Sequence, residues 1–302
     1  MKLYSAAETQ RLLPFSALLD ALERTVLDYA QGRLICPERV VTQAPGSSTL
    51  LMAMPCASPD LLVTKLLTIC PANAGSERPI IQGQVTCADA GTGELLFGLD
   101  GPTVTMRRTA AISMLGIRIF RREPVRRVLL VGTGAQAVAH CDALAALYPG
   151  VTIFIRARSP EKARGFCLRH VTPECDLRPE TGDEGRFDAV ITVTSSREVI
   201  YDAAPHPDTL VIGVGAFRPD MIEVGPRIVR ESSLYVDDPQ GAPSEAGDLI
   251  QADVDWASVR SLADALKEPP STDEPVFFKS VGCAAWDLAA CRVVVEEKED
   301  AV

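Results

Sequence analysis

Apolar and polar positions alternate in two different ways along this chain. From Ser5 to Gln31 the apolar residues recur at helical spacing, and Ser5 followed by Glu8 is typical of a helix start. Runs of strand-forming residues come next, and they predict β-strands at 48–54, 61–68, 80–89 and 94–98. The pattern then returns to helical spacing from Thr103 to Leu115. We therefore expect residues 1–122 to form an α/β domain.

Beyond the charged connector at 121–124, short apolar runs alternate with helical segments. The runs predict strands at 128–131, 151–155, 189–193, 210–214 and 233–236, with helices at 136–147 and 161–170. Such alternation favours a parallel sheet with right-handed crossovers. We expect this second domain to span 123–282. A final helix within 283–302 has an apolar face, and we expect it to return to the first domain.

The composition narrows the classes of function. The net charge of −10 over 302 residues argues against a general nucleic-acid binder or a binder of anionic membranes. Nine scattered cysteines and three histidines form no metal-ligand pattern, so no metal site is expected. Unpaired cysteines suit a reducing compartment, and no signal peptide or membrane-length apolar run is evident, so a cytoplasmic location is expected.

The predicted strand at 128–131 runs directly into a glycine pair and then into a helix. The segment is Gly132-Thr133-Gly134-Ala135-Gln136-Ala137, which matches the pattern G-x-G-x-x-[GA]. The glycines permit a tight turn and close backbone approach, and the helix start offers free N–H groups to a pyrophosphate. We predict a dinucleotide site here, because a second strand follows at 151–155 as the pattern requires. A plain strand-to-helix turn is the alternative.

The end of the second strand of this unit distinguishes the two nicotinamide cofactors. An acid there binds the ribose 2′-hydroxyl, whereas a basic or hydroxyl residue suits a 2′-phosphate. This chain has Arg156, Arg158 and Ser159 at that point, and no carboxylate before Glu161. We therefore predict NADPH, with NADH as the alternative and with solvated surface arginines as the simpler explanation. Three hydroxyl residues after the strand at 189–193 are expected at the ligand-binding edge, unless they are ordinary loop residues: Thr192, Thr194 and Ser195.

Four segments together resemble the ornithine cyclodeaminase/mu-crystallin family. They are Arg108-Thr109-Ala110-Ala111, Gly132 to Ala137, Gly215 to Glu223, and Phe278-Lys279-Ser280-Val281-Gly282, in the family's order. The resemblance implies a Rossmann doubly wound parallel sheet and an N-terminal α/β domain for substrate binding and dimerisation, completed by the C-terminal helix. It also implies that Gly215 and Lys279 contact the cofactor.

The resemblance further implies a cationic pocket for the carboxylate of an amino or imino acid. Arg108, Lys65 and Arg39 look like its members, with Lys65 and Arg108 also serving catalysis. A guanidinium can hold a carboxylate with two hydrogen bonds, and an ammonium can neutralise charge or donate a proton. The alternatives are a surface ion pair for Arg108 and a protective edge-strand lysine for Lys65. Arg107 is expected to point away from this pocket.

One position departs from the family pattern. Cyclodeaminases that resemble this chain have an aspartate where Phe217 stands, and phenylalanine can shape a substrate pocket but cannot transfer a proton. Asp220 and Glu223 are expected in the following turn and helix rather than in the site. Deamination is therefore disfavoured, and the resemblance implies hydride transfer to an imine.

We therefore expect reduction of a cyclic 2-imino acid with NADPH. The substrate would be Δ1-pyrroline-2-carboxylate or Δ1-piperideine-2-carboxylate, and the product L-proline or L-pipecolate. Two alternatives stay open: a dehydrogenase of open-chain substrates, such as an alanine dehydrogenase or an iminosuccinate reductase, and a crystallin-like protein that binds NADPH without turnover. The family resemblance also implies a homodimer.

Overall fold

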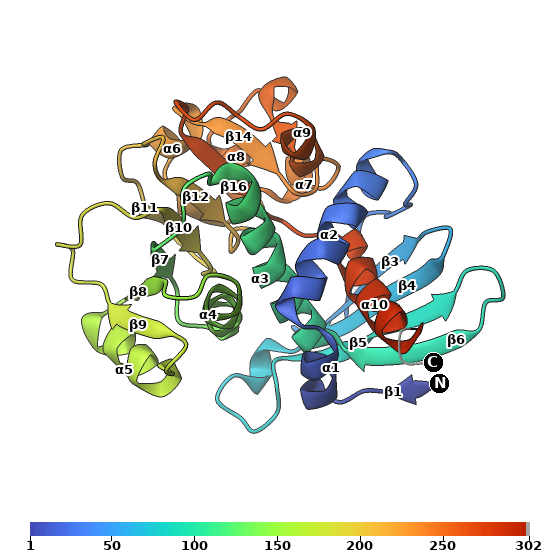
Figure 1. Ribbon diagram of the computed structural model, residues 1–302. Helices are drawn as coiled ribbons and strands as arrows, with labels where there is room; N and C mark the ends of the chain where they lie inside the picture. Colours follow the sequence, from blue (N-terminus) through green and yellow to red (C-terminus); the bar gives the residue numbers. More distant parts are fainter. Residues whose placement is uncertain (300–302) are drawn as a thin grey trace. The chain divides into compact units, whose positions relative to one another are not determined.

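A computed structural model describes residues 1–299, and in it the chain divides into two units (Figure 1). Unit 1 comprises Met1–Thr109 and the chain from Cys283 onward, and unit 2 comprises Ala110–Gly282. The division falls inside helix α3 (Gly101–Phe120). This helix continues without a break past the expected end at Leu115. Residues 300–302 of the predicted C-terminal segment lie outside the described residues.

Unit 1 is built on a six-stranded sheet in the order β1-β6-β5-β4-β3-β2. All neighbouring strands are antiparallel except β1 and β6, which are parallel. The strands are β1 (Lys2–Leu3), β2 (Val40–Gln43), β3 (Leu50–Ala57), β4 (Leu61–Ile69), β5 (Ile81–Asp89) and β6 (Leu95–Asp100). The helical elements are α1 (Ala6–Leu12), α2 (Phe15–Ala30), the short η1 (Pro71–Asn73), the start of α3, and α10 (Ala284–Glu299).

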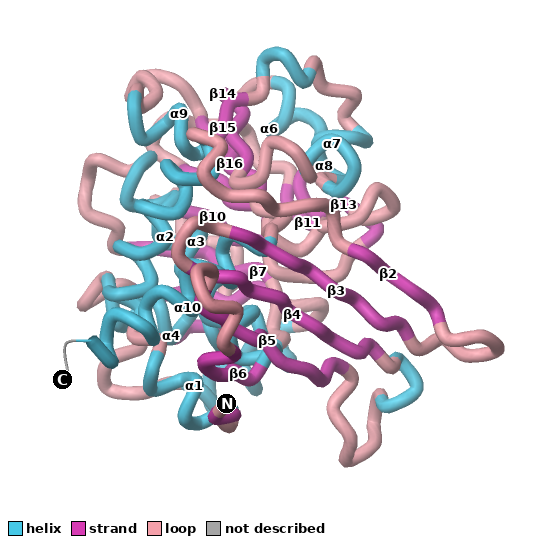
Figure 2. The backbone as a smooth tube through the Cα atoms, turned by 90° about the vertical axis from the view of Figure 1, so that its right-hand side faces the viewer, coloured by secondary structure: helices cyan, strands magenta, loops and turns pink. Residues whose placement is uncertain are grey.

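The two faces of this sheet follow from the alternation of residues along β4. Leu61, Val63, Lys65 and Leu67 are buried, whereas the residues between them are exposed. Helix α10 packs against β3 and β4 on one side and against α2 on the other. The C-terminal helix therefore completes the N-terminal unit, as the sequence predicted. Figure 2 views unit 1 onto the face of the sheet that these helices leave uncovered.

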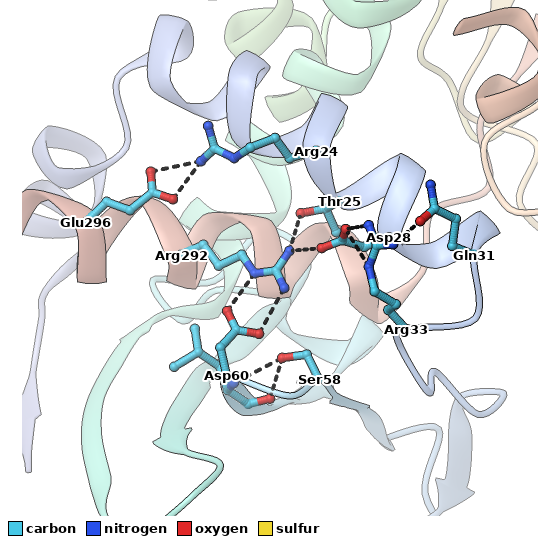
Figure 3. A network of polar contacts seen from close by, with 10 residues as sticks. Arg24, Thr25, Asp28, Gln31, Arg33, Ser58, Asp60, Arg292 and Glu296 are labelled. Atoms are coloured by element: carbon cyan, nitrogen blue, oxygen red, sulfur yellow. Dashed lines mark hydrogen bonds and ion pairs between the residues drawn. The ribbon is translucent and has the colours of Figure 1, made fainter. Parts of the chain in front are cut away.

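Arg292 fixes the position of α10 through an ion-pair network (Figure 3). Its Nε and Nη2 donate to the two carboxylate oxygens of Asp60 at 2.8 and 2.9 Å, in the turn between β3 and β4. Its Nη1 donates to Asp28 Oδ2 at 2.8 Å and to Thr25 at 3.2 Å, both on α2. One guanidinium thus joins three segments that are far apart in the sequence.

Unit 2 contains an eight-stranded parallel sheet in the order β15-β14-β16-β12-β10-β7-β8-β9. Its strands are β7 (Arg127–Val131), β8 (Thr152–Arg156), β9 (Asp176–Pro179), β10 (Ala189–Thr192), β12 (Leu210–Gly213), β14 (Ser233–Val236), β15 (Arg260–Ser261) and β16 (Val276–Lys279). A separate pair consists of β11 (Arg197–Tyr201) and β13 (Ile222–Val224). The helices are the rest of α3, α4 (Ala135–Leu147), α5 (Pro160–His170), α6 (Pro226–Arg230), α7 (Ala242–Glu245), α8 (Gly247–Gln251), η2 (Trp256–Ser258) and α9 (Leu262–Lys267).

The order in which the chain adds strands to the sheet reverses at the central strand β7. From β7 the chain proceeds through β8 and β9 to one edge, then returns to β10 on the other side of β7. Strands β10 and β12 are buried throughout, which explains their uninterrupted apolar sequences. The reversal between β7 and β10 creates the switch point at which doubly wound sheets bind their ligands.

The predicted fold class is confirmed, and the main differences concern short elements. The sequence analysis missed β2, whose four residues are all exposed, and the short strands β9, β11 and β13. Across residues 1–299, no helix combines the length and the apolar content that a bilayer span needs.

Candidate functional site

A buried ion cluster lies in unit 1 where β4, α3 and α10 meet. Lys65 on β4 is 2 % exposed, Arg108 on α3 is 6 % exposed, and Asp287 on α10 is fully buried. The Lys65 ammonium lies 2.9 Å from Asp287 Oδ2 and donates to Oδ1 at 3.2 Å. Arg108 Nε lies 3.5 Å from the same Oδ1. The structure thus brings together two of the three predicted cationic residues, around an acid that the sequence analysis had missed.

The charges of this cluster do not cancel. Lys65 and Arg108 carry two positive charges, and Asp287 carries one negative charge. Arg108 Nε is buried and has no hydrogen-bond acceptor within the described chain. A buried cation without full compensation is costly, and a carboxylate ligand placed here would relieve that cost. The cluster therefore has the electrostatic character of an anion site.

The surroundings of Lys65 lower the pKa of its ammonium to about 8. Burial is the largest cause, because it disfavours the charged form. Asp287 opposes this effect, while the positive charges of Arg108 and Arg39 add to it. An ammonium with a pKa near neutrality is suited to donate a proton.

The other residues predicted for the substrate site have more varied positions. Arg39 is half-buried, between the bridge residue Ile35 and β2, and it contributes to the electrostatics of Lys65. Arg107 is directed elsewhere, as expected: its Nε donates to the Leu13 carbonyl at 2.7 Å. Phe217 belongs to unit 2 and is 42 % exposed, after β12.

A second candidate site lies in unit 2, at the carboxyl ends of β7, β8 and β10. It is a cavity of about 490 Å³, and its lining includes Gly132, Thr133, Gly134, Arg158, Lys162, Thr194 and Ser195. Gly132 has φ 133°, and a Cβ there would lie 2.9 Å from the Val193 side chain, so only glycine fits. Gly134 is the N-cap of α4 and has no side chain to cap it, so the first N–H groups of the helix remain available for a phosphate. Ala135 and Gln136 begin this helix.

The basic residues at the end of β8 differ in what they can offer. Arg156 holds Glu180 with two hydrogen bonds, from Nε at 2.7 Å and from Nη2 at 2.5 Å, so its donors on that side are already used. Arg158 is exposed and lines the cavity, and Lys162 joins it from α5, a residue that the sequence analysis missed. The Ser159 hydroxyl accepts from the Lys162 backbone N–H as the N-cap of α5. The geometry therefore favours Arg158 over Arg156 as a phosphate ligand.

Three residues predicted to contact the cofactor have internal partners instead. Thr192 is fully buried, and its hydroxyl donates to Glu223 at 3.0 Å. Lys279 is fully buried and pairs with Asp248 at 2.8 Å. Gly215 donates its N–H to Glu223 at 2.6 Å, and a Cβ there would overlap the Thr194 backbone. Thr192 and Lys279 are buried behind the cavity, whereas Gly215 is only partly buried.

Glu223 organises this region, although the sequence analysis expected it in a turn or helix. The structure places it on β13, fully buried. In addition to Thr192, its carboxylate accepts hydrogen bonds from the N–H groups of Thr194 at 2.5 Å, Gly215 at 2.6 Å and Ala216 at 3.2 Å. It therefore fixes the loops that follow β10 and β12. Burial raises the pKa of Glu223, and the nearby charge of Lys279 lowers it.

Both missed acids carry a weak signal in the sequence. Asp287 is a lone charge among the apolar residues 284–291, and Glu223 stands between Ile222 and Val224. An acid in an apolar segment is unexpected unless it is paired. That signal shows that a partner exists but does not identify it.

Fold and site together define an oxidoreductase with a Rossmann unit for a nicotinamide cofactor. The sequence model of the ornithine cyclodeaminase/mu-crystallin family matches residues 1–301, and the chain belongs to this family.

Related reductases match nearly the whole chain. Delta(1)-pyrroline-2-carboxylate reductase 2 of Burkholderia ambifaria is 48% identical, over 96% of this chain and 93% of its own. Delta(1)-pyrroline-2-carboxylate/Delta(1)-piperideine-2-carboxylate reductase of Azospirillum brasilense is 47% identical over the same shares. Among solved structures, the Thermococcus litoralis Delta(1)-pyrroline-2-carboxylate reductase in complex with NADH and L-proline superposes with a TM-score of 0.88 at 22% identity, covering 99% of this chain and 98% of that one. This last likeness concerns the fold.

Proposed function

We propose that this protein reduces a cyclic 2-imino acid with NADPH. The substrate is Δ1-pyrroline-2-carboxylate or Δ1-piperideine-2-carboxylate, and the product is L-proline or L-pipecolate. The observation that carries the proposal is the surplus positive charge of Lys65 and Arg108 around Asp287. The two bacterial relatives at 47% and 48% identity are reductases of such cyclic imines, which supports the choice of substrate.

In this reaction the substrate carboxylate completes the charge balance of the cluster. The Arg108 guanidinium binds it, with help from Arg39 at the more exposed side. The Lys65 ammonium has three N–H donors, and its pairing with Asp287 leaves a donor for the substrate. The carboxylate is thereby held in one orientation, which accounts for much of the rate gain in a reaction of this kind.

The imine nitrogen gains a proton and the imine carbon gains a hydride, so that the C=N bond becomes CH–NH. The bound nicotinamide supplies the hydride. The Lys65 ammonium supplies the proton to the nitrogen, and the resulting neutral amine recovers a proton from water. This step fits a pKa of about 8, because a weaker acid would transfer its proton less readily.

The preference for NADPH rests on the basic residues of the unit 2 cavity. Arg158 and Lys162 line it, and both can bind a 2′-phosphate. We expect Arg158→Ala to raise the KM for NADPH about 10-fold, which corresponds to one charge-assisted contact, and to leave the KM for NADH unchanged. Equal effects on both cofactors would argue against a 2′-phosphate contact at this residue.

We further propose that the enzyme is a homodimer formed through the uncovered face of the unit 1 sheet. Val40, Leu51, Leu62 and Leu66 project from this face and are exposed. A contiguous apolar surface on a folded unit indicates an interface. An archaeal alanine dehydrogenase whose fold matches with a TM-score of 0.86 is a dimer with bound NAD. Light scattering of the purified protein tests this proposal, and a monomeric mass would contradict it.

We place the enzyme in the cytoplasm. All nine cysteines lie within the described residues, and none of them forms a disulfide there. Free thiols persist in a reducing compartment.

The direct test is an assay of NADPH oxidation with five-membered and six-membered cyclic imino acids, with NADH as the comparison. We expect turnover with at least one ring size. Pyruvate plus ammonia and a dicarboxylate imine serve as open-chain controls. Faster turnover of the open-chain substrates would replace the proposal with a dehydrogenase of that kind. Tight NADPH binding without turnover of any imino acid would indicate a ligand-binding protein instead.

A further inference from the structure

Asp287 occupies a position that favours a charged carboxylate despite complete burial. It lies in the first turn of α10, where the helix dipole stabilises a negative charge. Its two oxygens face Lys65 on β4 and Arg108 on α3. Cys291 follows one helical turn later, and its thiol pKa is raised by the hydrogen bond that it donates to Cys87 and by burial. That thiol stays neutral, so it does not compete for the two cations.

We propose that Asp287 is a positioning residue for the reduction: it holds the Lys65 ammonium and the Arg108 guanidinium in the arrangement that receives the substrate carboxylate and imine nitrogen. This inference rests on the proposed function and assigns a role to a residue that touches the two cations rather than the substrate. Its basis is geometric, because one carboxylate lies 2.9 Å from Lys65 Nζ and 3.5 Å from Arg108 Nε.

The charges around Lys65 explain why the arrangement depends on Asp287. Arg108 and Arg39 both disfavour the ammonium form of Lys65, as does burial, and Asp287 opposes all three. Without the carboxylate, Lys65 would lie beside two arginines with no compensating charge from α10. The neutral amine would then be favoured, and it cannot donate a proton to the imine. The pKa of Lys65 should therefore fall in a variant that lacks this charge.

The test compares Asp287→Asn with wild type by two independent measurements. The first is the titration of Lys65 Nζ by NMR in protein labelled with [15N]lysine. The chain has six lysines, and Lys65→Arg identifies the signal. The second is the pH dependence of kcat/KM for imine reduction. We expect Asp287→Asn to lower the pKa of Lys65 by about one unit or more, and the basic limb of the pH profile to move down by the same amount.

Two further variants make the result specific. Asp60→Asn removes a carboxylate from the ion pairs of Arg292 on the same helix, away from Lys65, and both measurements should match wild type. Asp287→Glu keeps the charge and should restore part of the activity. If Asp287→Asn does not fold, Asp287→Glu takes its place: the longer side chain changes the distances to Lys65 and Arg108, so kcat/KM should fall while the Lys65 pKa and the basic limb stay near their wild-type positions, and wild-type kcat/KM would overturn the positioning role.

The outcomes separate this inference from the proposed function. A Lys65 titration that is unchanged in Asp287→Asn overturns the positioning role. A titration that shifts while the basic limb stays in place overturns it as well, and also removes Lys65 as the proton donor. If the wild-type protein reduces no imino acid, the proposed function fails, and the Lys65 titration still decides whether Asp287 controls the ammonium.

Discussion

The two units each bury a lysine against an aspartate, but they differ in the third charge. In unit 1 the third charge is Arg108, so the cluster of Lys65 and Asp287 has a surplus positive charge. In unit 2 the third charge is Glu223, beside the pair of Lys279 and Asp248, so the surplus is negative.

The difference lies in how each surplus is compensated. Glu223 accepts hydrogen bonds from three backbone N–H groups and one hydroxyl, all from its own unit. Arg108 Nε has no acceptor in the described part of the chain. A buried charge that is fully hydrogen-bonded within the protein can hold neighbouring segments in place. A buried charge without such partners is costly, and a bound ligand of opposite charge would reduce that cost. We therefore propose that the cluster of unit 1 binds a ligand, whereas the hydrogen-bonded Glu223 of unit 2 supports the loops after β10 and β12.

The largest effect should come from Arg108→Ala. We expect kcat/KM for the imino acid to fall about 1,000-fold, because a buried guanidinium–carboxylate contact contributes roughly 4 kcal/mol to transition-state binding. The melting temperature should change little, since the substitution removes an incompletely compensated charge. Unchanged kcat/KM would refute the binding role of unit 1.

The neighbouring arginine provides the matched control. Arg107 donates to the Leu13 carbonyl at 2.7 Å, and its guanidinium lies 3.9 Å from the centre of the Phe15 ring. Arg107→Ala should therefore cost about 1 kcal/mol of unfolding free energy and leave kcat/KM close to wild type.

Glu223→Gln, unlike Arg108→Ala, should mainly lower the stability of the protein. An amide oxygen accepts fewer hydrogen bonds than a carboxylate, and its NH₂ group would face the N–H groups of Thr194 and Gly215. We expect a loss of roughly 2 to 3 kcal/mol in unfolding free energy, measured by chemical denaturation. Cofactor affinity should fall as well, because the loops after β10 and β12 lose their anchor. A fully stable variant would show that Glu223 is no scaffold.

The pH dependence tests the chemistry of unit 1. In the proposed reaction the ammonium form of Lys65 is the active form, and its pKa is about 8. As pH rises through that value the proton donor is lost, so kcat/KM should fall about tenfold for each further pH unit. Activity that stays constant up to pH values near 10 would exclude Lys65 as the proton donor.

The smallest effect should come from Asp60→Asn. The pairing with Arg292 lowers the pKa of Asp60 from 3.8 to about 2, although burial opposes this shift. A lowered folded-state pKa adds stability above the unfolded value, which is lost as pH falls through the folded one. Because the carboxylate is partly solvated, the contribution should stay below about 1 kcal/mol. The difference in melting temperature from wild type should shrink as pH falls from about 4 through about 2, and a difference that stays constant over this range would contradict this explanation.

The fold was predictable where local pattern alone determines it. The apolar run before Gly132 predicted a Rossmann strand, and the strand-forming residues at 61–68 predicted β4. Strand β2 could not be predicted, because all four of its residues are exposed and no alternation of apolar and polar residues marks a buried face.

The candidate site was predictable only in part, since partners depend on tertiary structure. Lys65 was predicted from the family resemblance, but its partner Asp287 lies 222 residues away and was not predicted. Arg156 was predicted to bind a phosphate, and only the structure shows that Glu180 uses its donors. Lys279 and Thr192 were predicted to contact the cofactor, and only the structure shows that they pair with Asp248 and Glu223 from distant segments.

The most direct test of the central claim is a crystal structure of the protein with NADP⁺ and L-proline. The claim predicts the proline carboxylate within about 3 Å of Arg108 and Lys65, with the proline Cα facing the nicotinamide. A structure in which the carboxylate binds elsewhere, with Arg108 and Lys65 contacting only Asp287 and solvent, would contradict it.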